Sequence, residues 1–151
     1  MDNRISWDEY FLNIAEAVSL RSLDPSTKHG TVIVDNKNHI ISTGYNGPIR
    51  GIDDSKIDWT RPNKYAEILH SEENSILHSR QDLTGCTAYI TGRPCHRCLR
   101  MMIQAGIKKI IYGDRSSKCI DEDDLRHSNK MVELSGIELI EYKSKDDKDL
   151  G

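Results

Sequence analysis

The alternation of apolar and polar positions divides the first part of the chain into a helix and two strands. Apolar residues recur from Trp7 to Val18 at the spacing of one helix face. This pattern predicts a helix from about residue 7 to residue 22, with Ser6 as its N-cap. The β-branched runs at 30–35 and 39–45 flank a short polar segment, which is typical of a β-hairpin.

The second half of the chain alternates between helical and strand-like patterns. Glycines at 106 and 136 mark the ends of two of the helices. Segment 46–69 between the two halves is rich in glycine, proline and aspartate and has no clear period. A loop of this length is either mobile or functional. The predicted helices are 70–80, 94–106 and 121–136, and the predicted strands are 86–91, 108–113 and 137–142.

The order of these elements predicts an α/β fold. Strands that alternate with helices in the second half imply parallel pairing, and the initial hairpin adds an antiparallel pair. We therefore expect one mixed five-stranded sheet with helices on both faces.

Composition narrows the class of protein further. The chain has 151 residues, which favours one domain with a proper core, and a formal net charge of −3. This charge argues against a nucleic acid polymer as partner, although a small phosphorylated ligand needs only a few local cations. No apolar run reaches the roughly 20 residues of a membrane span, and the first residues lack a secretory signal pattern. The four scattered cysteines favour a reducing, cytoplasmic setting.

The motif Pro94-Cys95-x-x-Cys98 opens one of the predicted helices. Proline suits the first turn of a helix, and the two cysteines, three residues apart, share a face of that turn. The partial positive charge of a helix start favours thiolates, the form that binds metal. A redox motif of the thioredoxin kind also opens a helix, so this alternative stays open here.

A second helix start carries His70 and Glu72. Two residues apart within a helix, these side chains would point in nearly opposite directions. If His70 is instead the cap and Glu72 lies in the first turn, both can converge on one point. His70, Cys95 and Cys98 are therefore candidate metal ligands. Three protein ligands leave one tetrahedral position for water, as in a catalytic zinc site. A structural site needs a fourth ligand, for which the candidates are Cys86, Cys119, His78 and His96.

The combined pattern resembles a known family. His-x-Glu, followed after 21 residues by Pro-Cys-x-x-Cys, is the motif of the zinc-dependent deaminases. The segments STGYNG at 42–47 and PCHRCLRMMIQAGIKKIIYG at 94–113 are similar to the deoxycytidylate (dCMP) deaminases. The resemblance covers residues 5–142 and implies a cytidine deaminase-like three-layer α/β/α domain, followed by a charged tail at 143–151. One departure is Ser71, where the family usually has alanine.

The resemblance implies a hydrolase that converts dCMP to dUMP, releases ammonia and supplies a precursor of thymidine nucleotides. Zn²⁺ activates the attacking water, and Glu72 moves the protons as base and then acid. Glu73 is the competitor for this role. Its side chain points about 100° further around the helix, so we expect a surface or ion-pair role for it.

The resemblance also implies which residues hold the nucleotide. Asn46 is expected to bind the deoxyribose, and the Ser71 and Cys95 backbones are expected to hold the pyrimidine. A tight turn is the simpler explanation of Asn46-Gly47. Tyr112 could equally be an aromatic residue of the core, and each charged residue could simply be a solvated surface side chain. The candidates for the phosphate end of the pocket are Ser22, Lys28, Tyr112, Arg115 and Lys118.

Members of the family are often hexamers that are activated by dCTP with Mg²⁺ and inhibited by dTTP. The candidate effector residues here are Gly47, Arg50 and Asp53. Two other functions compete with dCMP deamination. One is a related zinc deaminase that acts on cytidine, guanine or a tRNA adenosine. The other is a non-catalytic zinc-binding module, which has no need of Glu72.

Overall fold

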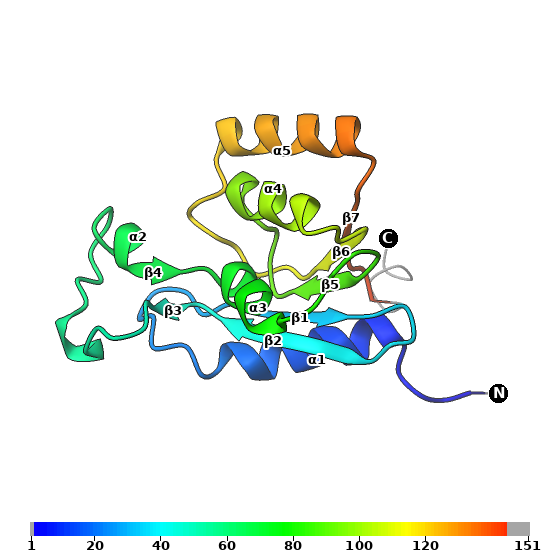
Figure 1. Ribbon diagram of the computed structural model, residues 1–151, viewed down its shortest axis with the longest axis horizontal. Helices are drawn as coiled ribbons and strands as arrows, with labels where there is room; N and C mark the ends of the chain where they lie inside the picture. The colour runs from blue at the N-terminus through cyan, green and yellow to red at the C-terminus, as the bar shows by residue number, and fades with distance from the viewer. Residues whose placement is uncertain (1, 145–151) are drawn as a thin grey trace.

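The computed structural model describes residues 2–144, and the predicted tail lies outside this part of the chain from residue 145 onward. The fold is built on the expected mixed sheet of five strands (Figure 1). Across the sheet the strands are β2 (Ile40–Tyr45), β1 (Gly30–Val34), β5 (Thr87–Ile90), β6 (Lys109–Tyr112) and β7 (Glu138–Glu141).

Strand directions follow the prediction. β1 pairs antiparallel with β2 as a hairpin, and β5, β6 and β7 pair in parallel. β1 also pairs antiparallel with β5 and so joins the two halves into one sheet. As a result, the amino end of β1 and the carboxyl ends of β2, β5 and β6 meet at one edge of the sheet. In open α/β sheets, ligands bind outside the carboxyl ends of the parallel strands.

Helices cover both faces of the sheet (Figure 1). The N-terminal helix α1 (Trp7–Ser19) begins at Ser6, whose hydroxyl accepts the Glu9 N–H. It ends three residues earlier than predicted and packs Phe11 and Ala15, both 0% exposed, on one face of the sheet. The opposite face carries α3 (Ser71–Ser79) and α4 (His96–Gln104), and α5 (Glu122–Ser135) packs beside α4.

Helix α3 lies very close to β2. A Cβ atom at Gly44 would lie 2.4 Å from the Ser75 backbone nitrogen, so only glycine permits this approach. The Ser42 hydroxyl also donates to the Ser75 carbonyl at 2.6 Å. These contacts fix the start of α3 near the carboxyl end of β2.

Segment 46–69 has more regular structure than its sequence predicts. It contains a second, two-stranded sheet that the absence of periodicity concealed. The short elements are β3 (Gly47–Pro48), the 3₁₀ helix Asp54–Lys56, α2 (Lys64–Glu67) and β4 (Ile68–Leu69). No helix within residues 2–144 is both long and apolar enough to cross a membrane.

Candidate active site

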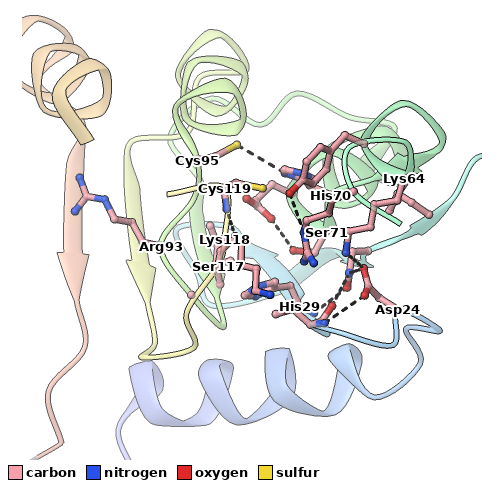
Figure 2. A pocket seen from close by; sticks show the side chains of 18 residues that line it. Asp24, His29, Lys64, His70, Ser71, Arg93, Cys95, Ser117, Lys118 and Cys119 are labelled. Atoms are coloured by element: carbon pink, nitrogen blue, oxygen red, sulfur yellow. Dashed lines mark hydrogen bonds and ion pairs between the residues drawn. The ribbon is translucent and has the colours of Figure 1, made fainter. Parts of the chain in front are cut away.

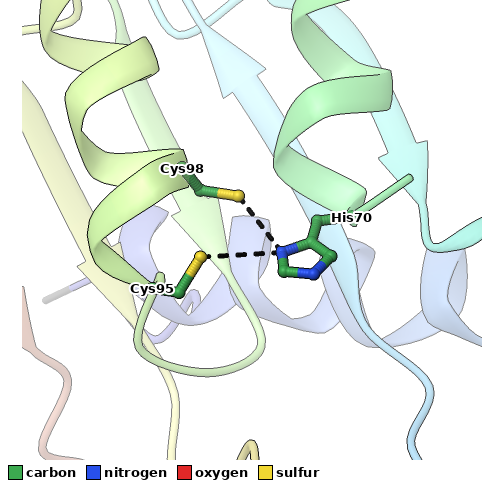
Figure 3. Close-up of side chains that lie close together, drawn as sticks. All are labelled: His70, Cys95 and Cys98. Atoms are coloured by element: carbon green, nitrogen blue, oxygen red, sulfur yellow. Dashed lines mark hydrogen bonds between the residues drawn. The ribbon is translucent and has the colours of Figure 1, made fainter. Parts of the chain in front are cut away.

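Two helix starts bring the three predicted ligand side chains together. His70 is the N-cap of α3 and Cys95 the N-cap of α4, each with extended backbone, and Cys98 lies in the first turn of α4. The Nδ1 atom of His70 is 3.2 Å from the Cys98 sulfur and 3.7 Å from the Cys95 sulfur (Figure 3). The three ligand atoms lie within 4.8 Å of one another.

This donor set fits zinc. One imidazole and two thiolates are among the ligands that zinc prefers, and three protein ligands leave a position for water. The neighbouring Cys98 thiol lowers the pKa of Cys95, and His70 adds to this effect, so Cys95 favours its thiolate form. Among the described residues, no fourth His, Cys, Asp or Glu joins the cluster within the same distance.

The alternative ligands of a closed structural site lie elsewhere or are otherwise engaged. Cys86 is 4% exposed and packs in the apolar core. The His96 ring contacts Asp124 instead of the cluster, and His78 is exposed near the Thr43 carbonyl. Cys119 lines the adjacent pocket and interacts with the His70 side chain, but it does not lie within the same distance of all three ligand atoms.

Glu72 is buried at the side of this cluster. It is 5% exposed and lines the same pocket as His70 and Cys95. Its Oε1 atom accepts the Ser71 hydroxyl at 2.7 Å, and the Ser71 oxygen lies 2.8 Å from the Thr31 hydroxyl. Burial raises the pKa of the Glu72 carboxyl, while His70 and the Ser71 hydrogen bond act in the opposite direction. A carboxyl group in such an environment can both take up and release a proton.

Glu73 has a different role from its neighbour. Its Oε1 atom accepts the backbone N–H of His70 at 2.9 Å and so caps the start of α3. We expected a surface or ion-pair role, but the residue is half-buried and caps the helix. The reason is that the first N–H groups of a helix have no partner within the helix.

A pocket of about 650 Å³ of empty space, partly open to solvent, lies beside the cluster at the ligand-binding edge of the sheet. Of the residues predicted to hold the nucleotide, Asn46, Ser71, Cys95 and Lys118 line this pocket. Ser71, Cys95 and Lys118 are labelled in Figure 2. The others, Ser22, Lys28, Tyr112 and Arg115, are not among its lining residues.

The Asn46 side chain ties the end of β2 to the loop between α1 and β1. Its Oδ1 atom accepts the His29 backbone N–H at 2.8 Å. Its Nδ2 atom donates to the Thr27 carbonyl at 2.9 Å and to Asp24 at 3.4 Å. The tight-turn explanation is wrong, because no turn forms at Asn46-Gly47 and the chain runs on from β2 into β3. Both amide hydrogens are used, but Oδ1 keeps a second lone pair for a ligand hydroxyl.

The predicted phosphate residues outside the pocket have other contacts. The Arg115 guanidinium donates to the Glu16 carboxylate and to the Ser19 hydroxyl, and so fastens its loop to α1. The Ser22 hydroxyl, 2% exposed, donates to the Asn46 carbonyl at 2.8 Å. The Tyr112 hydroxyl accepts from Arg93 at 3.3 Å, and Lys28 is exposed.

Three basic residues that the sequence reasoning missed do line the pocket: Arg61, Lys64 and Arg93. The Lys64 ammonium is buried and donates to Asp24 at 2.9 Å. Figure 2 shows Arg93 directed away from the other labelled side chains, in accordance with its bond to Asn129. The unusual length of segment 46–69 was the one signal that pointed to Arg61 and Lys64.

The predicted effector residues lie outside this pocket in the described structure. Gly47 pairs with Leu69 in the small sheet, and Arg50 is exposed. Asp53 caps the 3₁₀ helix by accepting the Ser55 N–H. Their proposed role stays a prediction.

Comparison with known proteins agrees with this geometry. Residues 5–114 match the model of the "cytidine and deoxycytidylate deaminase zinc-binding region". The chain belongs to this deaminase family. The deoxycytidylate deaminase of Homo sapiens is 34% identical to it over 143 residues, which cover 90% of this chain and 79% of the human protein. The deoxycytidylate deaminase of Mus musculus is 33% identical over 151 residues, which cover 95% and 84%.

A solved structure of a family relative has the same fold as this deaminase. The dCMP deaminase of cyanophage S-TIM5, in complex with dCMP and dUMP, superimposes with a TM-score of 0.71 and is 26% identical in sequence. The match covers 94% of this chain and 99% of the phage protein. The expected cytidine deaminase-like fold is therefore confirmed.

Proposed function

We propose that this protein catalyses the hydrolysis of dCMP to dUMP and ammonia, a step that supplies precursor for thymidine nucleotides. The observation that carries the proposal is the convergence of His70, Cys95 and Cys98 beside the buried Glu72 in one pocket. The similarity to deoxycytidylate deaminases over most of the chain supports dCMP as the substrate.

The proposed zinc ligands are His70, Cys95 and Cys98. When bound, Zn²⁺ supplies an acidified water, whose pKa falls to about 7 in favourable sites. Glu72 accepts the two protons of the attacking water in turn, and delivers one to ring N3 and the other to the departing amino group at C4. Its burial beside the cluster suits one carboxyl group for both transfers. The hydrogen bond from Ser71 orients the carboxylate.

The sugar and phosphate are proposed to lie along the rest of the pocket. The Asn46 Oδ1 atom, next to the amino end of β1, is placed to accept a deoxyribose hydroxyl. Lys118 and Arg61 are exposed cations that line the pocket. The Lys64 charge is already paired with Asp24, so Lys64 fits a role in fixing the pocket wall.

The substrate assignment is tested by comparing dCMP, cytidine, dCTP and guanine as substrates of the purified protein. Ultraviolet absorbance follows the loss of the ring amino group. We expect dCMP to have the highest kcat/KM. A preference for an unphosphorylated nucleoside or for guanine would instead identify another zinc deaminase, and no turnover of any of these substrates would favour a non-catalytic zinc module.

The phosphate contact is tested by replacing Lys118 with alanine. A charged hydrogen bond contributes about 1.5–3 kcal/mol, so kcat/KM for dCMP is expected to fall about 10- to 100-fold. Turnover of deoxycytidine should change little, because it has no phosphate. Lys28→Ala is the matched control, since Lys28 is also exposed but does not line the pocket. Equal losses in the two variants would exclude Lys118 as the phosphate ligand.

Three further properties stay predictions. Regulation by dCTP with Mg²⁺ and by dTTP, and assembly into a hexamer, rest on the family resemblance. A cytoplasmic location rests on composition. They are independent of the chemistry proposed for Glu72.

A further inference from the structure

The start of helix α4 lacks the usual type of cap. An N-cap side chain normally accepts an N–H from the first turn of its helix. Cys95 occupies the N-cap position of α4, but its sulfur lies near His70, and it forms no side-chain cap bond. Because the Cys95 side chain forms no cap bond, the N–H of His96, the first residue of α4, needs an acceptor from elsewhere.

Helix α5 supplies this acceptor. The Oδ1 atom of Asp124 accepts the backbone N–H of His96, the first residue of α4, at 2.9 Å. The same oxygen lies 2.6 Å from Nδ1 of the His96 ring. One carboxylate therefore holds both the backbone and the side chain of the residue that follows Cys95.

Asp124 is itself held firmly. It is 4% exposed, and its backbone N–H donates to the Asp121 carboxylate at 2.8 Å at the start of α5. Its second oxygen, Oδ2, is buried and has no hydrogen-bond partner within the described structure. The hydrogen bonds of the Asp124 side chain therefore come from the backbone and ring of His96. A shift of α4 away from α5 would leave the buried carboxylate without these partners, which is costly.

We propose that Asp124 is a positioning residue for the metal centre. It fixes the first turn of α4 so that the sulfurs of Cys95 and Cys98 face His70 without rearrangement when the metal binds. This inference rests on the proposed zinc function. Its alternative is a purely structural contact, in which Asp124 only fastens α5 to α4.

The two roles differ in what they change. Loss of a group that orients metal ligands typically lowers metal affinity by about 10- to 100-fold. A purely structural contact lowers the free energy of unfolding of the metal-free protein and leaves the affinity of the folded protein unchanged. The dissociation constant for zinc, measured by competition with a chromogenic chelator well below the unfolding temperature, separates the two.

The experiment compares Asp124→Ala and Asp124→Asn with Asp123→Asn. Asp123 lies on the same helix turn but is exposed, and within residues 2–144 its ion pair is with Arg126. We expect the zinc dissociation constant to rise about 10- to 100-fold in Asp124→Ala. It should rise less in Asp124→Asn, because the amide oxygen can still accept the His96 N–H. In Asp123→Asn it should stay at the wild-type value. Co²⁺ in place of zinc should show a weakened thiolate-to-metal charge-transfer band in the same order.

Unchanged zinc affinity in both Asp124 variants, with lower stability alone, would overturn the proposal. If Asp124→Ala does not fold, the comparison of Asp124→Asn with Asp123→Asn tests the proposal. Equal zinc dissociation constants in these two variants would exclude a positioning role for Asp124. The proposed function is tested separately by the wild type. Wild-type protein that binds zinc but does not deaminate dCMP contradicts the proposed function and leaves the affinity comparison intact.

Discussion

Replacement of Glu72 by glutamine is expected to lower kcat for dCMP by about 10²- to 10⁴-fold, the range for loss of a positioned general acid–base. Glutamine has nearly the same shape and can still accept the Ser71 hydroxyl, but it cannot take up a proton. Because the residue is 5% exposed, water cannot readily replace the carboxylate. Steady-state kinetics by ultraviolet absorbance measure the effect, and zinc content should stay stoichiometric.

Glu73→Gln is the matched control for this prediction. The amide oxygen of glutamine can still accept the His70 N–H, which Glu73 accepts at 2.9 Å. We therefore expect kcat close to that of the wild type. Equal losses at the two positions, or full turnover in Glu72→Gln, would contradict the assignment of proton transfer to Glu72.

Replacement of Cys98 by serine is expected to remove both zinc and activity. The Cys98 sulfur is 3.2 Å from Nδ1 of His70, and a serine hydroxyl is a much weaker zinc ligand than a thiolate. Zinc content measured by atomic absorption should fall well below that of the wild type. The melting temperature should also fall, because a ligand at 1,000 times its dissociation constant stabilises the folded state by about 4 kcal/mol.

A second cysteine variant separates metal loss from general destabilisation. Cys86 is also buried, but it packs in the apolar core with Ile33 and Leu99. Cys86→Ser is expected to lower stability while zinc content stays at the wild-type level. Full zinc content in Cys98→Ser would rule out Cys98 as a ligand. Catalytic turnover by wild-type protein from which a chelator has removed all zinc would contradict the zinc mechanism itself.

The metal cluster was predictable because its ligands occupy special positions in local structure. His70 and Glu72 cannot converge within a helix, so their spacing required His70 at the cap, and the structure places it there. Proline before Cys95 indicated a second helix start. Strand directions were predictable for a similar reason, since alternating strands and helices leave few ways to pair β5, β6 and β7.

The pocket wall was less predictable, because contacts between distant residues decide it. Arg115 was a candidate for the phosphate, but its charge is paired with Glu16, which lies 99 positions earlier in the chain. Lys64 was missed, because its place in the wall depends on a buried pair with Asp24, 40 positions away. Periodicity within a segment contains no information on such pairs. The same limit explains why the small β3–β4 sheet was not predicted.

The contact between Asp124 and the start of α4 has a consequence for the boundaries of this domain. The segment that matches the family model ends at residue 114, yet the carboxylate that caps α4 and the fifth strand of the sheet both follow it. A recombinant fragment cut at that point would expose the apolar surface that Met131, Val132 and Ile137 cover. We therefore expect the smallest autonomous unit to be longer than the segment by which the family is recognised. Shortened versions should retain the chain through Tyr142, whose backbone N–H donates to the Tyr112 carbonyl at 2.9 Å and whose side chain packs against the core.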